Sequence, residues 1–118
     1  MPFKAILQDL ALKAGATGAI MLDREGEVVA SCAQNDSLQI DLIGAHHGII
    51  LNIIQDASTR SDFPEVSSVS ISTDSAKLSI SSIKEGYYLV VALEKRRPIG
   101  KTLFESRRAI KKIEEEMG

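Results

Sequence analysis

Residues 15–30 read GATGAIMLDREGEVVA, and this stretch decides the fold. Residues 19–22 are a short apolar run, which predicts a well-buried strand. Residues 23–26 (DREG) predict a tight turn, because an aspartate at the first position accepts a local backbone hydrogen bond and a glycine at the last tolerates a positive φ. Residues 27–32 then form the returning strand, so the stretch is predicted to be a β-hairpin.

Helices are predicted on both sides of this hairpin and at the end of the chain. The first begins near Pro2, which suits the first helical turn, and ends at Gly15. The second covers about residues 37–58, with Asp36 as its N-cap. The third begins near Ile99, and its predicted apolar stripe consists of Ile99, Leu103, Ile110, Ile113 and Met117.

The second helix carries more apolar surface than one buried face requires. At about 100° per residue its apolar side chains cover an arc roughly 180° wide, whereas a helix with one buried face needs only about 100°. The extra stripe is therefore predicted to meet another chain. The predicted dimer interface consists of Ile43, His47, Ile50 and Ile54 on this helix, together with Val69 and Ile71 on a strand edge.

Three more strands are predicted between the second and third helices, at residues 66–73, 78–81 and 87–93. The first two alternate serine with apolar residues, which indicates a sheet with one half-polar face. The third is the most continuously apolar, so we place it centrally. Because all strand-to-strand links are short, the sheet is predicted to be antiparallel, in an α+β fold with helices packed on its faces.

The composition narrows the class of protein. A chain of 118 residues is expected to form a single domain over residues 1–118. Its net charge of −2 gives no overall case for nucleic-acid binding, and its single cysteine closes no internal disulfide. The richest apolar stretch, residues 42–54, is too short to span a membrane. With no signal-peptide pattern at the start, we expect a cytoplasmic protein without integral membrane association.

Residues 15–30 resemble the opening hairpin signature of the Roadblock (dynein light-chain) domain family, in its short prokaryotic single-domain form. The long second helix, the three later strands and the final helix near Ile99 also fit, so the resemblance covers essentially the whole chain. It implies a three-layer helix–sheet–helix sandwich with element order α-ββ-α-βββ-α and strand order 2-1-5-4-3. It also implies a homodimer built from the second helices and edge strands, and a role as a partner or regulator of small GTPases or as a dynein light chain.

Several residues suggest chemistry, but none carries a predicted catalytic, cofactor or metal site. Residues 100–102 (GKT) resemble the end of a phosphate-binding loop, yet such a loop needs a glycine where Lys95 stands. Adjacent His46 and His47 diverge by about 100° on a helix and do not jointly bind one metal ion. Cys32 has no supporting histidine or acid, so we interpret it as a packed thiol. The chain is predicted not to be an enzyme and to hold no cofactor.

The charge is distributed unevenly along the chain. Residues 95–112 contain eight basic side chains against one acid, Glu105. The simplest interpretation is the solvated outer face of the last helix, and the alternative is a docking surface for an acidic partner or a headgroup layer. Nucleic acid is disfavoured, because only Phe104 offers a stacking aromatic near these cations.

Three functions fit these observations. The first, which we favour, is a non-enzymatic homodimeric scaffold that binds a small Ras-like GTPase and modulates its nucleotide state or location. The second is a small-ligand sensor of PAS type, which needs an interior cavity. The third is a structural light chain that joins larger proteins. In the first case the candidate partner-docking residues are Arg24, Arg60, Arg96 and Arg97, any of which is able to act in trans on a GTPase.

Overall fold

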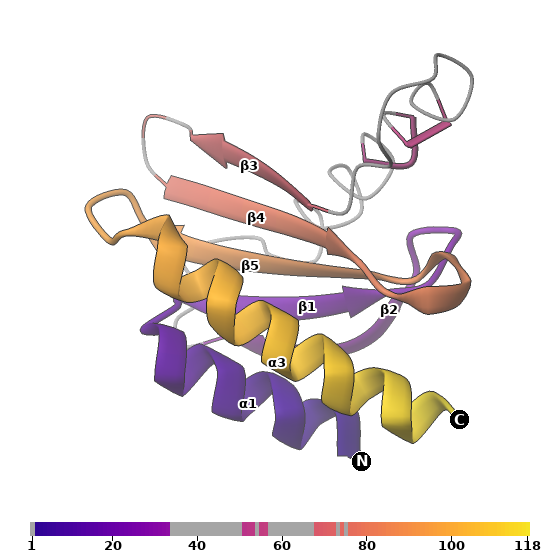
Figure 1. Ribbon diagram of the computed structural model, residues 1–118. Helices are drawn as coiled ribbons and strands as arrows, with labels where there is room; N and C mark the ends of the chain where they lie inside the picture. Colours follow the sequence, from indigo (N-terminus) through magenta and orange to yellow (C-terminus); the bar gives the residue numbers. More distant parts are fainter. Residues whose placement is uncertain (1, 34–50, 54, 57–67, 73, 75) are drawn as a thin grey trace.

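The computed structural model describes residues 2–33, 51–53, 55–56, 68–72, 74 and 76–118 (Figure 1). Residues 51–53 and 55–56 are helical and belong to the predicted second helix, whose other residues lie outside this part. The remaining elements, in chain order, are α1 (Pro2–Ala14), β1 (Gly18–Leu22), β2 (Val28–Ala33), β3 (Ser68–Ser72), β4 (Ala76–Ser82), the short 3-10 turn η1 (Lys84–Gly86), β5 (Tyr88–Glu94) and α3 (Ile99–Met117).

The predicted hairpin is confirmed, and its turn is held by the aspartate. Asp23 Oδ1 accepts hydrogen bonds from the backbone N–H groups of Glu25 at 2.9 Å and Glu27 at 3.0 Å. Gly26 has a φ of 85°, a conformation that residues with a side chain rarely adopt. Upstream, α1 ends where predicted, with Gly15 at a φ of 65°. The local chemistry of Gly15 therefore fixes the connection into β1, and that of Asp23 and Gly26 fixes the connection out of it.

The five strands form one antiparallel sheet in the order β2-β1-β5-β4-β3, as the family resemblance implied. β1 lies between β2 and β5, so the hairpin is joined directly to the strand predicted to be central. All residues of β1, and all of β5 except Glu94, are buried. Strands buried on both faces need layers on both sides of the sheet.

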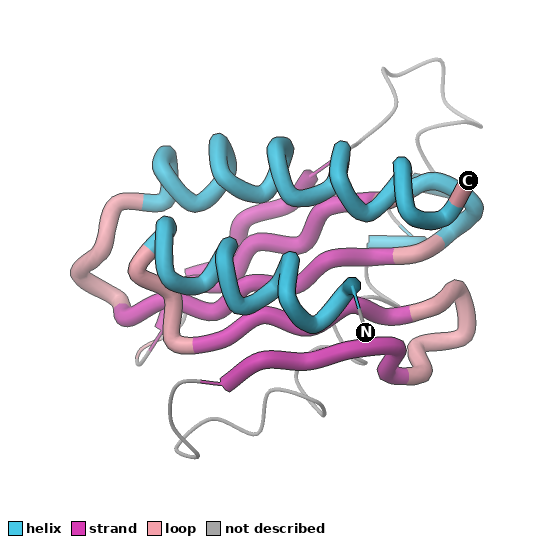
Figure 2. The backbone as a smooth tube through the Cα atoms, turned by 90° about the horizontal axis from the view of Figure 1, so that it is seen from below, coloured by secondary structure: helices cyan, strands magenta, loops and turns pink. Residues whose placement is uncertain are grey.

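α1 and α3 form the layer on one face of the sheet (Figure 2). They run in opposite directions, so the two ends of the chain lie at the same end of the molecule (Figure 1). None of the helices that the structure describes is long and apolar enough to cross a membrane. The core beneath this layer contains Leu7, Leu10, Ala11, Ala14, Ala16, Ala19, Met21, Ile83, Leu89, Val91, Leu93, Ala109 and Ile113.

The inner face of α3 differs from the predicted apolar stripe. Of that stripe only Ile113 is fully buried, whereas Ile99, Leu103, Ile110 and Met117 are half-buried. Three of the four buried positions of α3 carry small side chains, which let the helix backbone approach the strands. The half-buried apolar side chains lie along the flank of the helix. The four buried positions are Thr102, Ser106, Ala109 and Ile113.

A second, smaller core lies on the opposite face of the sheet. Side chains alternate along β1, so Ile20 and Leu22 point away from α1 and α3. Leu51, from the helical residues 51–53, is fully buried against them. The second core consists of Ile20, Leu22, Leu51, Ile80, Tyr88 and Val90, with Val69 and Ile71 of β3 at its margin.

Strand boundaries moved by one or two residues from their predicted positions. The largest difference is at β4, which begins at Ala76, two residues before the predicted start at residue 78. Ala76 pairs with Glu94 at the end of β5, so the tertiary pairing extends the strand beyond its locally recognisable pattern.

Thr102, buried on α3, and Thr17, half-buried before β1, test how a hydroxyl group contributes to stability with and without a hydrogen-bond partner. Thr102 Oγ1 has no hydrogen-bond partner, whereas Thr17 Oγ1 donates to the Ala92 carbonyl at 2.9 Å. We expect Thr102→Val to raise the free energy of unfolding by about 1 kcal/mol, because it removes an unsatisfied hydroxyl without changing the volume. Thr17→Val is expected to lower it by about 1 kcal/mol. Urea denaturation of both variants measures the difference, and equal effects would contradict the assignment.

Candidate interaction surfaces

β3 offers an open edge for pairing with another strand. It is the last strand of the sheet, and it pairs with β4 in an unbroken register. Its sequence, SVSIS, contains no proline or charge, the two features that usually protect an edge from pairing. The opposite edge strand, β2, has a register shift beside Met21 and Leu22. Of the two edges, β3 is therefore the better template for a second sheet.

The side chains of β3 divide between solvent and the second core. Ser68, Ser70 and Ser72 are exposed, whereas Val69 and Ile71 are half-buried against that core. The structure thus brings the two strand residues of the predicted interface onto one face of an open edge. The four helical residues of that interface, Ile43, His47, Ile50 and Ile54, lie outside the described residues.

The described turn of the second helix has apolar side chains on two opposite sides. Leu51 is fully buried, but Ile53 is 63% exposed. At 100° per residue the two side chains point about 200° apart, so Ile53 faces away from the sheet while Leu51 faces into it. Between them Asn52 is exposed. An isoleucine on the outer side of a helix is apolar surface that the described part of the chain does not cover.

The candidate arginines lie at opposite ends of the sheet. Arg24, in the first hairpin turn, donates from Nη2 to the Glu85 carbonyl at 3.1 Å. This bond joins the β1–β2 turn to η1, where Glu85 has a φ of 63°. Arg96 and Arg97 are exposed in the loop after β5, whose seven residues span about 23 Å. Arg60 lies outside the described residues.

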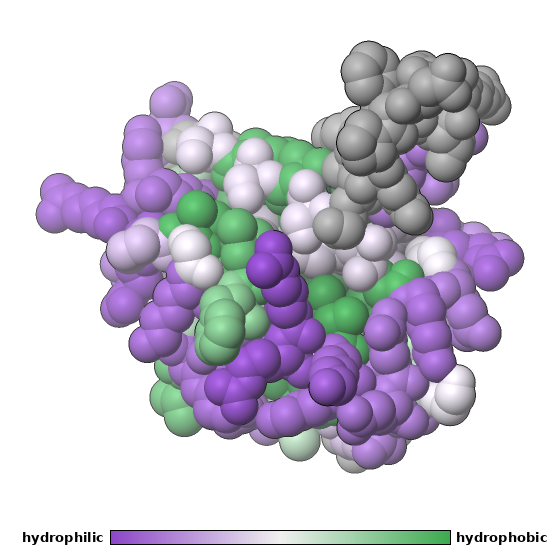
Figure 3. Space-filling model, in the orientation of Figure 1, coloured by the Kyte–Doolittle hydropathy of each residue, from purple (hydrophilic) through white to green (hydrophobic). Residues whose placement is uncertain are grey.

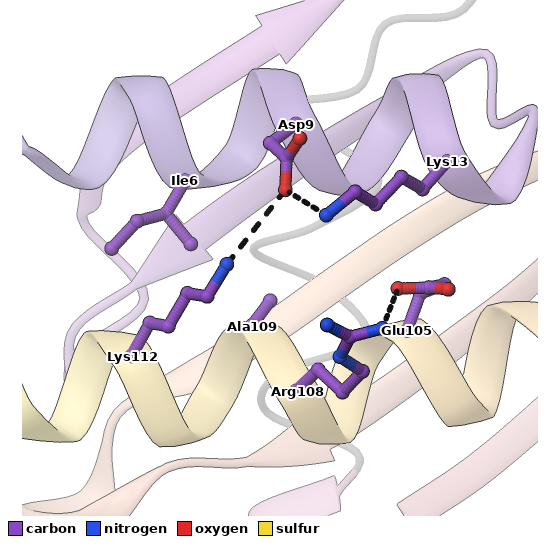
Figure 4. A pocket seen from close by; sticks show the side chains of 7 residues that line it. All are labelled: Ile6, Asp9, Lys13, Glu105, Arg108, Ala109 and Lys112. Atoms are coloured by element: carbon purple, nitrogen blue, oxygen red, sulfur yellow. Dashed lines mark ion pairs between the residues drawn. The ribbon is translucent and has the colours of Figure 1, made fainter.

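A cluster of charged side chains lies over the seam between α1 and α3 (Figure 4). Asp9 Oδ2 is 3.0 Å from Lys13 Nζ and 3.9 Å from Lys112 Nζ, so it bridges the two helices. On α3, Arg108 Nη1 lies 3.9 Å from Glu105 Oε1. All these side chains except Glu105 are about half exposed, and such pairs contribute little to stability.

The interactions of Asp9 favour its ionised form. The hydrogen bond from Lys13 lowers the pKa of the Asp9 carboxyl below its ordinary value of 3.8. Slight burial opposes this effect, and the charges of Lys13, Lys112 and Arg108 lower the pKa further. The cluster therefore stays ion-paired throughout the neutral and mildly acidic range. Local spacing along α1 and α3 did not reveal it, because the Asp9–Lys112 contact joins distant parts of the chain.

Among the described residues, the side chains considered for phosphate, metal or thiol chemistry do not form one site. No three His, Cys, Asp or Glu side chains among them come together as metal ligands would. Residues 100–102 lie in the first turn of α3, and Thr102 faces the sheet, where it is out of reach of a bound phosphate. Cys32 is a free, half-buried thiol on β2. His46 and His47 lie outside the described residues.

The sequence matches one protein family, and the fold matches several solved structures. The model of the Roadblock/LC7 domain family matches residues 2–93, which end before α3. No curated protein matches the sequence.

Solved structures match the fold over nearly the whole chain at low sequence identity. Myxococcus xanthus MglB matches with a TM-score of 0.86 and 14% identity, over 98% of this chain and 94% of that one. The gliding protein MglB from Thermus thermophilus matches with 0.84 and 17%, over 97% and 87%. A Roadblock/LC7 domain from Streptomyces avermitilis matches with 0.84 and 20%, over 97% and 96%. At this identity the three structures show the fold alone.

The charge cluster predicts a specific pH dependence. Because the pKa of Asp9 is lowered in the folded state, its ion pairs stabilise the protein above pH 3.8, and this contribution is lost as the pH falls through the lower folded value. Asp9→Asn should therefore reduce stability at neutral pH and have less effect in strong acid. NMR titration of the Asp9 carboxyl measures the pKa directly. We expect Lys13→Gln to raise it more than Lys112→Gln does, and equal, unshifted titrations in all three proteins would contradict the pairing.

Proposed function

The chain belongs to the Roadblock/LC7 domain family, and we propose that it is a non-enzymatic homodimeric scaffold that binds a small Ras-like GTPase. In this role it modulates the nucleotide state or location of the GTPase. The observation that carries the proposal is the family match over residues 2–93, since members of this family typically serve as partners or regulators of small GTPases. We treat residues 1–118 as one domain of this kind.

The homodimer is supported by two surfaces. The open edge of β3 supplies unpaired backbone groups, with Val69 and Ile71 at its margin. Ile53 adds an exposed apolar side chain on the outer side of the second helix. Pairing through both would hydrogen-bond the edge and remove the isoleucine from water. Together with the helical residues predicted from sequence, these groups make up the proposed interface.

Regulation by such a scaffold requires only surface complementarity. A dimer that binds one conformation of the switch loops better than the other shifts their populations toward it. An arginine acting in trans would add electrostatic stabilisation of the transition state. Of the described candidates, Arg24 is already bonded to Glu85, so Arg96 and Arg97 in the exposed loop are better placed to reach a partner.

The ligand-sensor alternative finds no support in the described part of the chain. Two depressions there, of about 330 Å³ and 240 Å³, are open to solvent; the first is lined largely by polar or charged residues such as Lys84 and Glu114, and the second by cations and apolar residues in similar measure. A sensor of PAS type encloses its ligand in an apolar interior cavity. The light-chain alternative shares the dimer with our proposal and differs in the partner.

Dimerisation predicts that a carboxylate placed in the interface separates the two chains. We expect Ile53→Asp and Ile50→Asp to weaken the dimer by at least about 2 kcal/mol, roughly a 30-fold rise in the dissociation constant, because association would bury an unpaired charge. Ile53 is 63% exposed, so its substitution leaves the folded chain intact. Light scattering across a dilution series measures the molar mass.

Asn52→Asp is the matched control for this experiment. It adds the same charge to the neighbouring, exposed position of the same helix. We expect it to remain dimeric at concentrations where Ile53→Asp is monomeric. A parent protein that is monomeric throughout, or variants that all behave alike, would contradict the interface.

The GTPase is tested with a Ras-like protein encoded near the same gene. We expect this protein to bind it and to change its rate of GTP hydrolysis or nucleotide release by about tenfold or more, which corresponds to about 1.4 kcal/mol in the barrier. If Arg96 acts in trans, Arg96→Ala should remove most of a stimulation of hydrolysis, whereas Arg24→Ala should not. Binding to motor or receptor peptides without any small GTPase would favour the light chain instead.

A further inference from the structure

The outer surface of the helical layer carries a cluster of cations of which the proposed function uses only Arg97. We call it the basic face. Figure 3 shows hydrophilic side chains gathered over α1 and α3, with hydrophobic ones among them. Its exposed cations are Lys13 of α1, Arg97 of the loop before α3, and Lys101, Arg108, Lys111 and Lys112 of α3. Lys13 and Lys112 also pair with Asp9, and Arg108 with Glu105, so these three cations share their charge with an acid.

The basic face is centred on one side of α3. At 100° per residue, Lys101, Phe104, Arg108 and Lys111 fall on the side opposite to the buried Thr102 and Ser106, and the exposed Glu115 lies on the same side near the end of the helix. This side points away from the sheet, whereas the dimer interface proposed above involves β3 and the second helix. The basic face is therefore free in the proposed dimer.

The charges at the two ends of α3 oppose the helix dipole. The positive end of a helix dipole is the N-terminus, yet the first turn of α3 has no acid and contains Lys101. The last turn has no base, although the residues around it include Glu114, Glu115 and Glu116. Lys112 also follows Arg108 at a spacing of four, a repulsive pair. Since this arrangement costs helix stability, an anionic partner provides a reason for it.

Exposed apolar side chains lie among these cations. Leu12 of α1 is 77% exposed, and Phe104 of α3 is 56% exposed. The Arg108 guanidinium lies 5.9 Å from the centre of the Phe104 ring. Cations that flank exposed aromatic and aliphatic groups are typical of surfaces that rest on a membrane, with the apolar groups among the headgroups and the cations on the phosphates.

The shape of the basic face also suits a headgroup layer. The seam between α1 and α3 encloses only about 10 Å³, so it gives no groove for an extended acidic peptide. At the end of the seam, a shallow depression of about 240 Å³ is lined by Leu12, Lys13, Arg97 and Lys101, among others. Its size and charge fit a lipid phosphate group at the surface.

From charge, exposed apolar groups and shape together, we propose that the basic face docks the protein on an anionic phospholipid membrane. Its cations bind headgroup phosphates, while Leu12 and Phe104 lie between the headgroups. The family match ends at residue 93, so it does not cover α3 and its charges. Docking of this kind is peripheral and reversible, because it depends on charge and on two shallow anchors.

A dimer would strengthen this docking, a consequence that rests on the proposed function. Antiparallel pairing of two β3 edges about a two-fold axis perpendicular to the sheet leaves each face of the sheet on its own side. Both α1–α3 layers then lie on the same side of the joined sheet. The two basic faces are then able to bind the same membrane. Once one face is bound, the other is held close to the surface, so the affinity of the dimer exceeds that of one chain.

The test is co-sedimentation of the full chain with vesicles. We expect binding to phosphatidylcholine vesicles that contain phosphatidylglycerol, no binding to phosphatidylcholine alone, and weaker binding as salt is raised. Lys101→Glu and Lys111→Glu should each reduce partitioning by about fivefold or more. Lys4→Glu is the matched control, because Lys4 is exposed on α1 but points about 160° away from Ile6, which lines the seam.

Two variants distinguish membrane docking from a loss of folding and from an acidic protein partner. Lys101→Glu places an acid in the first turn of α3, where the helix dipole favours it and Glu105 four residues later opposes it, so its melting temperature should stay near that of the parent while its vesicle binding falls. Loss of binding through unfolding would lower both. Phe104→Ser should weaken vesicle binding at every salt concentration, since it removes an anchor and no charge. If Phe104→Ser binds like the parent and soluble polyglutamate binds to the basic face instead, an acidic protein replaces the membrane and the proposal is overturned.

The outcomes distinguish this inference from the GTPase role. A dimer that acts on a GTPase but ignores anionic vesicles, or whose charge reversals behave like Lys4→Glu, overturns the membrane docking alone. A protein that binds vesicles but no GTPase overturns the other proposal alone. In the Ile53→Asp monomer, vesicle binding should persist at least tenfold more weakly, and unchanged binding would refute the paired arrangement of the two faces.

Discussion

The pairing of β1 with β5 is the constraint on which the rest of the molecule depends. These two strands are buried on both faces, so neither tolerates water above or below it. α1 and α3 satisfy one face with a large core. The other face holds a smaller core to which the described part of the chain contributes Leu51 as a helical cover. Because β1 and β5 must be covered on both faces of the sheet, the fold requires both the layer of α1 and α3 and the second helix.

The surfaces proposed for binding follow from this division. The face under α1 and α3 is closed by the chain itself, and the outer side of that layer is left to carry charge. The face toward the second helix ends in the open, uncharged edge of β3. One molecule therefore presents two kinds of surface: an apolar one suited to a copy of itself or a folded partner, and a basic one suited to anions.

Much of the fold could be predicted from local chemistry. Pro2 and Gly15 delimit α1, and Asp23 with Gly26 fixes the hairpin, because each acts through contacts within a few residues. The strand order followed from the resemblance of residues 15–30 to a known family, confirmed by the structure. The inner face of α3 was predicted in part. Ile113 lies in the core and Ile99, Ile110 and Met117 pack against it, but close packing also buries the small Thr102 and Ser106, which hydrophobicity did not indicate.

The contacts that build the surfaces were beyond the reach of sequence reasoning. Arg24 bonds to Glu85, 61 residues away, and Asp9 joins α1 to Lys112 across the helical layer. Such pairs depend on how elements meet and leave no trace in local periodicity. The run of cations at residues 95–112 was visible, but only the structure shows Leu12 of α1 exposed beside it.

The register shift in β2 has a consequence for the size of any assembly. A sheet with two equivalent free edges adds copies without limit and grows into a fibre, as each newcomer exposes another edge. Here the register shift beside Met21 and Leu22 makes the outer edge of β2 a poor match for a further strand. In the proposed dimer, growth that begins at β3 would therefore close after a single addition, and the register shift in β2 would keep the assembly finite.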